Sequence, residues 1–83
     1  MNKQDILKDA LDSRKQEVIG YQINIDNYVR AIAKINAEYT NNVAMIEFRD
    51  RLTDMLAAHK TEQLKAVIMR DVIADQLIEM EES

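Results

Sequence analysis

The sequence predicts an all-α protein: an antiparallel helical hairpin of two long helices that assembles into a homo-oligomeric coiled coil or four-helix bundle. Three observations predict it. Proline is absent and glycine occurs once, so the residues that usually interrupt helices are missing. Apolar residues recur at steps of four and three through both halves of the chain. A single cluster of turn-forming residues, 40–42, separates the two halves.

The first helix is predicted over about residues 3–39. Asn2 is a suitable N-cap, and Asp5 stands where a capping-box acid would. One heptad frame then continues without a break, and Arg14 is its only charged member; it comprises Leu7, Leu11, Arg14, Val18, Tyr21, Ile25, Tyr28, Ile32, Ile35 and Tyr39. Residues 21–26 alternate as a strand would, but the chain offers no second strand, so we favour the helix.

The second helix is predicted over about residues 43–80, after a turn at 40–42 in which either asparagine could cap it. Its four-three frame comprises Met45, Phe48, Leu52, Met55, His59, Glu62, Ala66, Met69, Ile73, Gln76 and Met80. Two more apolar rows lie beside this frame: Leu56, Val67, Ala74 and Leu77, and then Leu64, Ile68 and Val72. The acidic tail, 81–83, opposes the helix dipole and is expected to fray.

The apolar arc of the second helix is wider than one hairpin partner can cover. A chain of 83 residues forms one small domain, and an elongated one buries little core on its own. We therefore expect a homo-oligomer, with a dimer of hairpins forming a four-helix bundle as the favoured arrangement.

Composition limits the possible partners. The net charge is −4, and the excess of acidic residues lies entirely in residues 42–83, so direct nucleic-acid binding is not expected. Cysteine is absent, which removes disulfides and thiolate chemistry and fits a reducing compartment. No apolar core of a signal peptide follows Met1, and apolar runs are at most four residues long. These features predict a cytoplasmic protein without a membrane segment.

Polar residues within the seam are the first candidate site. With the turn near Asn41, residue i should face about residue 82−i, which brings together Tyr21, His59 and Glu62. We interpret this trio as a polar layer that fixes register and oligomer state. Acid–base chemistry would need a nucleophile and a cleft as well. A metal site on His59 and Glu62 would need further ligands, so neither a metal nor a cofactor is expected.

Two arginines form the second candidate site. Arg14 lies within the first frame and should approach Ile68 and Met69, while Arg70 is flanked by apolar positions at a similar height. The simpler interpretation is that nearby acids, such as Asp71, pair with them. The alternative is an anion site, in which two guanidinium groups bind a phosphorylated or nucleotide-like ligand at a subunit interface.

The sequence therefore predicts a small non-enzymatic interaction protein: a regulator, inhibitor, adaptor or assembly factor that binds a partner protein through an oligomeric bundle. Compact acidic helical chains are frequent among bacteriophage accessory proteins, and the likeness extends only to size, charge and helix content. The alternative is the anion binder just described. Candidates for contact with the partner are the outward apolar residues Ile19, Ile23, Leu64, Ile68 and Val72.

Overall fold

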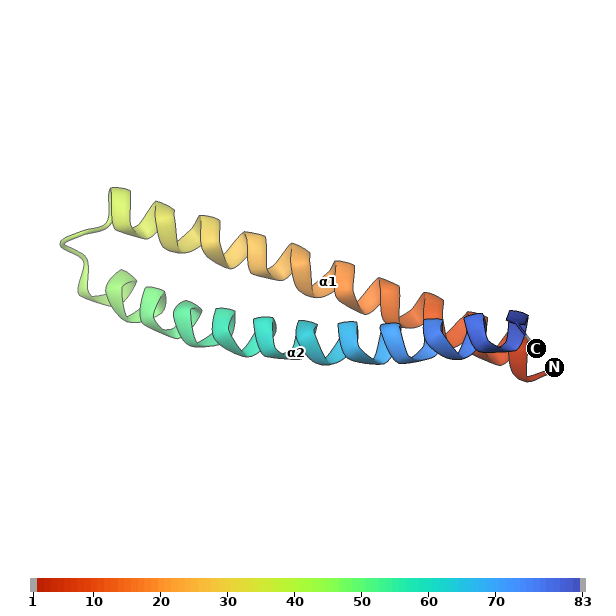
Figure 1. Ribbon diagram of the computed structural model, residues 1–83. Coiled ribbons are helices and arrows are strands. Elements are labelled where there is room, and N and C mark those ends of the chain that lie inside the picture. The colour runs from red at the N-terminus through yellow and green to blue at the C-terminus, as the bar shows by residue number, and fades with distance from the viewer. Residues whose placement is uncertain (1, 83) are drawn as a thin grey trace.

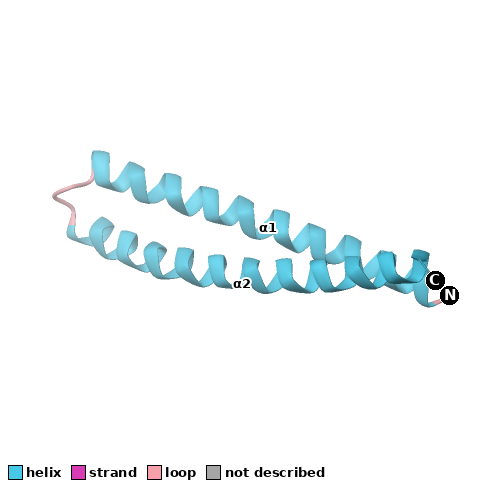
Figure 2. Ribbon diagram, viewed as in Figure 1, coloured by secondary structure: helices cyan, strands magenta, loops and turns pink. Residues whose placement is uncertain are grey.

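Two long α-helices joined by a short turn make up the protein in a computed structural model, which describes residues 2–82. Helix α1 spans Lys3–Glu38 and helix α2 spans Val43–Glu82. They lie side by side and antiparallel, so both ends of the chain lie at one end of the rod (Figure 1). The Cα atoms of this rod extend over 63 × 16 × 16 Å. Residues 2–82 contain no strand, which confirms the all-α prediction (Figure 2).

Asparagine side chains cap the start of both helices. Asn2 Oδ1 accepts a hydrogen bond from the Asp5 N–H at 2.9 Å, and Asn42 Oδ1 accepts one from the Met45 N–H at 3.1 Å. Each cap satisfies a backbone donor that the first helical turn leaves without an intrahelical partner. At the end of α1, the Tyr39 N–H donates to Ile35 O at 2.9 Å.

The end of α2 differs from the expected fraying. The helix continues to Glu82, so 81 and 82 are helical, while 83 lies outside the described residues. An acid in the last turn opposes the helix dipole by only about 0.3–1 kcal/mol at an exposed site. That cost is too small to stop a helix that is already anchored along its length.

The buried side of α1 is the side that the heptad predicts. Of its ten predicted seam positions, nine are buried or half-buried, and Tyr39 at the very end is 40% exposed. The most deeply buried are Ile25 and Ile35, each 6% exposed. The unbroken step of four and three keeps these side chains on one stripe facing α2.

Helix α2 is rotated relative to the predicted frame. One predicted row faces α1 as expected: Met45, Leu52, His59, Ala66, Ile73 and Met80 are all buried or half-buried. The other predicted row is wrong, because Phe48, Met55, Glu62 and Met69 are exposed and only Gln76 is half-buried. The row one residue further on faces α1 instead: Arg49, Leu56, Gln63, Arg70 and Leu77.

The rotation has a packing reason. Leu56 and Leu77 belong to the observed row, and Val67 and Ala74 lie directly beside it, so turning α2 this way covers all four at once. The polar members of the row find hydrogen-bond partners, two of them on α1, so their burial leaves no side-chain donor unsatisfied among the described residues.

Candidate functional site

A ring cluster occupies the middle of the seam. His59 lies between Tyr21 and Tyr28 of α1, with edge-on ring contacts at centroid distances of 5.8 and 5.1 Å. The His59 Nδ1 is 2.9 Å from Met55 O, one turn back on its own helix. Edge-on aromatic contacts of this kind contribute about 0.5–1.5 kcal/mol beyond the area they bury. The cluster therefore helps to fix the level of α2 against α1 at the middle of the seam.

Glu62 does not join this cluster. Its Oε1 accepts a hydrogen bond from Lys65 Nζ at 2.9 Å, and both side chains are exposed. The hydrogen bond to Glu62, and then the negative charge of Glu62, raise the pKa of Lys65 above the ordinary value of 10.5. The charge of Tyr21 makes the smallest contribution to that rise.

Gln63 forms a second polar link between the helices. Its Nε2 donates to Gln22 Oε1 at 2.8 Å and to Val18 O at 3.3 Å. Gln22 in turn donates from its own Nε2 to Asp26 Oδ1 at 3.0 Å. These contacts place Gln63 level with about residue 20 of α1, so facing residues here are shifted by about one position from the expected 82−i relation.

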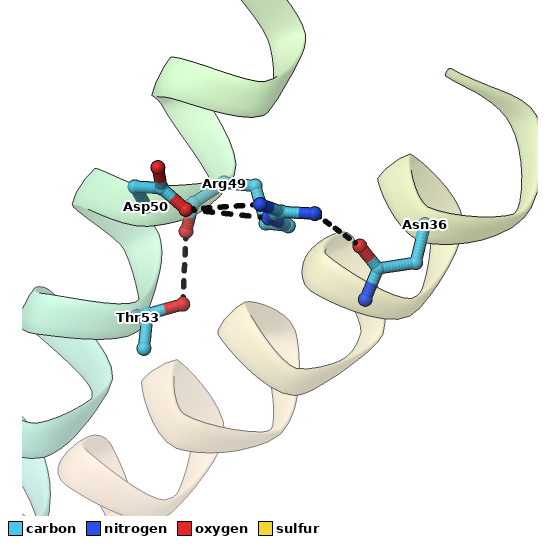
Figure 3. A network of polar contacts seen from close by, with 4 residues as sticks. All are labelled: Asn36, Arg49, Asp50 and Thr53. Carbon is cyan, nitrogen blue, oxygen red and sulfur yellow. Dashed lines mark hydrogen bonds and ion pairs between the residues drawn. The ribbon is translucent and has the colours of Figure 1, made fainter. Parts of the chain in front are cut away.

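Arg49 forms a third link near the turn (Figure 3). Its Nη1 donates to Asn36 Oδ1 on α1 at 3.1 Å. The Nε and Nη2 atoms of the same guanidinium reach Asp50 Oδ1 at 3.3 and 3.2 Å, and Thr53 Oγ1 donates to Arg49 O at 3.0 Å. Sequence reasoning missed both Gln63 and Arg49, because polar residues in a seam give no signal by hydrophobic periodicity.

Arg14 and Arg70 each pair with a carboxylate on their own helix. Arg14 Nη1 lies 3.1 Å from Glu17 Oε2, and Arg70 Nε lies 3.0 Å from Asp71 Oδ1. Arg70 also lines an open hollow of about 480 Å³ with Lys15, Val18, Ile19 and Asp71; Arg14 is not among the residues that line it. The two guanidinium groups therefore turn to different carboxylates, an arrangement that does not favour a shared anion.

The rotation of α2 divides the remaining apolar surface into two flanks. In an antiparallel pair, residues that directly precede the facing row on each helix project to the same side. On α2 these include Phe48, Met55 and Met69, which are 40%, 43% and 42% exposed; Val72 continues this side and is 45% exposed. We call this side the methionine flank; on α1 it holds Ala10, Gly20 and Ala31.

The methionine flank is indented near its middle. A hollow of about 250 Å³ lies over α1, lined by Glu17, Gly20, Tyr21 and Asn24. A Cβ built on Gly20 meets nothing within 4 Å, so the backbone is open to an approaching neighbour here. The phenylalanine and the methionines of the flank come from α2, while α1 contributes small residues together with Ile6 and charged residues such as Glu17 and Lys34.

The opposite side is called here the isoleucine flank, defined by Ile19 of α1 and Leu64 of α2 on either side of the Gln22–Gln63 link. The side chains of Ile19 and Leu64 are 54% and 63% exposed. The other sequence-predicted contact residues are also exposed: Ile23 at 56% and Ile68 at 61%, on the outer edges of their helices, and Val72, which belongs to the methionine flank.

No protein family, curated protein or solved structure matches this chain. Within residues 2–82, neither helix has a stretch that is both long and apolar enough to cross a bilayer.

Proposed function

We propose that this chain is a non-enzymatic interaction protein, acting in the cytoplasm as a regulator, adaptor, inhibitor or assembly factor. It works as a homo-oligomeric helical bundle, with a dimer favoured, and binds a partner protein through the surface that the bundle leaves outside. One observation carries the proposal: thirteen large apolar side chains among residues 2–82 are at least 40% exposed, against six residues that are buried.

Single exposed apolar residues are common in monomers, but rows at helical spacing are a different feature. Phe48, Met55 and Met69 share one heptad row, and Leu64, Ile68 and Val72 follow at steps of four. Covering one such side chain fully contributes about 1.5–3 kcal/mol, so a few of them can support association. Rows at this spacing are also how a helix presents anchors to a partner helix or groove.

The surface proposed for the partner protein is the isoleucine flank with the outer edge of α2. Ile19 and Leu64 lie at the same level on the two helices, and Ile68 follows one turn further along α2. The hollow beside Ile19 carries both signs of charge, from Lys15, Arg70 and Asp71. A partner helix with apolar anchors and a mixed polar edge fits this combination.

Affinity capture from the native cell, followed by mass spectrometry, tests the proposal. The bait is the wild-type chain, compared with Leu64→Asp on the isoleucine flank and with Ala37→Asp, which adds the same charge at an exposed α1 position away from it. We expect one partner to be retained by wild type and by Ala37→Asp but lost with Leu64→Asp. Retention of the same proteins by all three baits refutes the proposed surface.

A further inference from the structure

We propose that a second copy of this chain docks on the methionine flank, with the two rods antiparallel. The two-fold axis passes by Gly20 of α1 and between Glu62 and Lys65 of α2. This proposal rests on the proposed function, because it specifies the surface through which the bundle assembles. It assigns α2 two interfaces, one with α1 and one with the second copy.

The sequence of α2 carries two seams that share one row. Leu52, His59 and Ala66 belong to the shared row, which faces α1. On one side of it the row that runs from Arg49 to Leu77 at seven-residue steps completes the seam with α1. On the other side the row that runs from Phe48 to Gln76 repeats at the same spacing but is mostly exposed and has no helix packed against it. A helix with two overlapping heptad frames packs against two other helices.

The flank is large enough for a stable interface. A face 63 Å long and 16 Å wide offers roughly 1,000 Å², above the roughly 800 Å² per partner of a standard interface. The apolar residues lie toward the two ends of the flank. Phe48 and Met55 lie toward the turn, Met69 and Val72 toward the chain ends, and the charged pair Glu62–Lys65 lies between them.

This order is self-complementary in an antiparallel pairing of α2 with α2. When the axis passes between Glu62 and Lys65, each Glu62 faces Lys65 of the second copy, and two symmetric ion pairs form at the centre. Met55 then faces the second copy's Val72, and Met69 faces its Ala58. Both methionines thus meet apolar residues and opposite charges meet at the axis, as electrostatic complementarity favours, while Phe48 lies opposite Glu79 near each end of the pairing.

The same axis also produces complementary contacts between the two α1 helices. The Gln22–Gln63 hydrogen bond fixes the level of α1 against α2, and that level places Gly20 at the axis. Ala10 then faces Ala31 of the second copy. Lys3 faces the second copy's Glu38, so that opposite charges pair near each end of the rod. Gly20 lacks a side chain at the point where the two backbones cross most closely.

The other two-fold arrangement is less favourable. In it the two-fold axis is parallel to the rod, so that α2 of one copy stacks on α1 of the other and both helices lie at the same height along the rod. Arg51 of one copy then lies beside Lys34 of the other, because both are at nearly the same height on the methionine flank. Like charges placed together across an interface oppose association, whereas in the antiparallel arrangement Arg51 lies opposite Gln76 of the second copy, about one turn from its Glu79.

Sedimentation equilibrium tests association, and charge reversal tests the surface. Lys65→Glu places four acids at the axis and is expected to raise the dimer Kd at least about tenfold. Glu62→Lys with Lys65→Glu restores both the pair within each chain and the pairs between chains, so the Kd should return to within about threefold of wild type. Ile68→Glu, a charge added on the outer edge of α2, should leave the Kd unchanged.

Cysteine cross-linking tests the axis itself, since the chain has no cysteine of its own. Gly20→Cys should give a covalent dimer with a short bis-maleimide reagent. Ser13→Cys is the matched control: it lies on the same flank one heptad away, so the two copies of residue 13 are roughly 20 Å apart along the rods.

Two outcomes overturn different statements. A wild-type chain that stays monomeric at 100 µM refutes both this inference and the proposed bundle. A wild-type dimer that is insensitive to Lys65→Glu, or that cross-links at residue 13 and not at residue 20, refutes the methionine flank as the interface but leaves self-association standing.

Discussion

Truncating Leu52 to alanine is the most direct test of how the two helices pack. Leu52 belongs to the row of α2 that faces α1 and is 5% exposed. Buried leucine-to-alanine changes cost 2–5 kcal/mol, and the cost grows with the size of the cavity that remains. In a rod of two helices the surroundings are thin and water can reach the gap, so we expect about 2–3 kcal/mol.

The assay is urea unfolding followed by circular dichroism at one fixed protein concentration. With a slope of about 1 kcal/mol per M for a protein of this size, the midpoint should fall by about 2–3 M, with an unchanged slope. If wild type unfolds below that concentration of urea, thermal unfolding gives the same comparison.

Leu64→Ala is the matched control, because it makes the same change on the same helix at a side chain that is 63% exposed. Its effect should stay within about 0.5 kcal/mol, as is usual for exposed positions. Equal losses at Leu52 and Leu64 would refute the packing described here, because burial would then not distinguish the two positions.

Three further predictions follow from the polar contacts. His59→Leu should raise the free energy of unfolding by about 1 kcal/mol and broaden the distribution of oligomeric states, since a polar seam residue fixes register at some cost in stability. If chemical denaturation instead shows a lower free energy of unfolding, the lost ring contacts with the tyrosines outweigh that gain. A double-mutant cycle on Asn36→Ala and Arg49→Ala should give a coupling of about 0.5–1 kcal/mol, and additive losses would show that the hydrogen bond contributes nothing. Because Glu62 raises the pKa of Lys65, the contribution of this ion pair to the free energy of unfolding is complete at pH values just below 10.5 and is lost as the pH rises through the higher pKa of the folded state. Glu62→Gln should lower the pKa of Lys65 in an NMR titration. An unchanged pKa would show that Glu62 is not the cause of the rise.

The sequence alone was sufficient to predict the two helices and the turn between them. Heptad spacing located the buried side of α1 from Leu7 to Ile35, and Asn2 and Asn42 cap the helices as asparagine in those places predicts. These features depend on local chemistry, which is why one sequence can predict them.

The rotation of α2 could not be predicted in the same way. Phe48, Met55 and Met69 are more apolar than Arg49, Gln63 and Arg70, so hydrophobicity alone selects the wrong row. The observed row is favoured by the cover that it gives to the apolar residues Leu56, Val67, Ala74 and Leu77. It is also favoured by contacts between the helices, in which Asn36 and Gln22 of α1 supply acceptors for Arg49 and Gln63. Such pairings depend on which residues face each other across the seam, a relation that periodicity within one helix does not contain.

The position of the two chain ends has a geometric consequence. Both lie at the end of the rod opposite the turn (Figure 1). A fluorophore or fusion domain attached to either terminus would therefore emerge from the same tip. In the proposed antiparallel pair the two labelled tips would point in opposite directions, separated by about the 63 Å length of one rod. The assembly would then act as a spacer that holds two attached cargoes apart at a fixed distance.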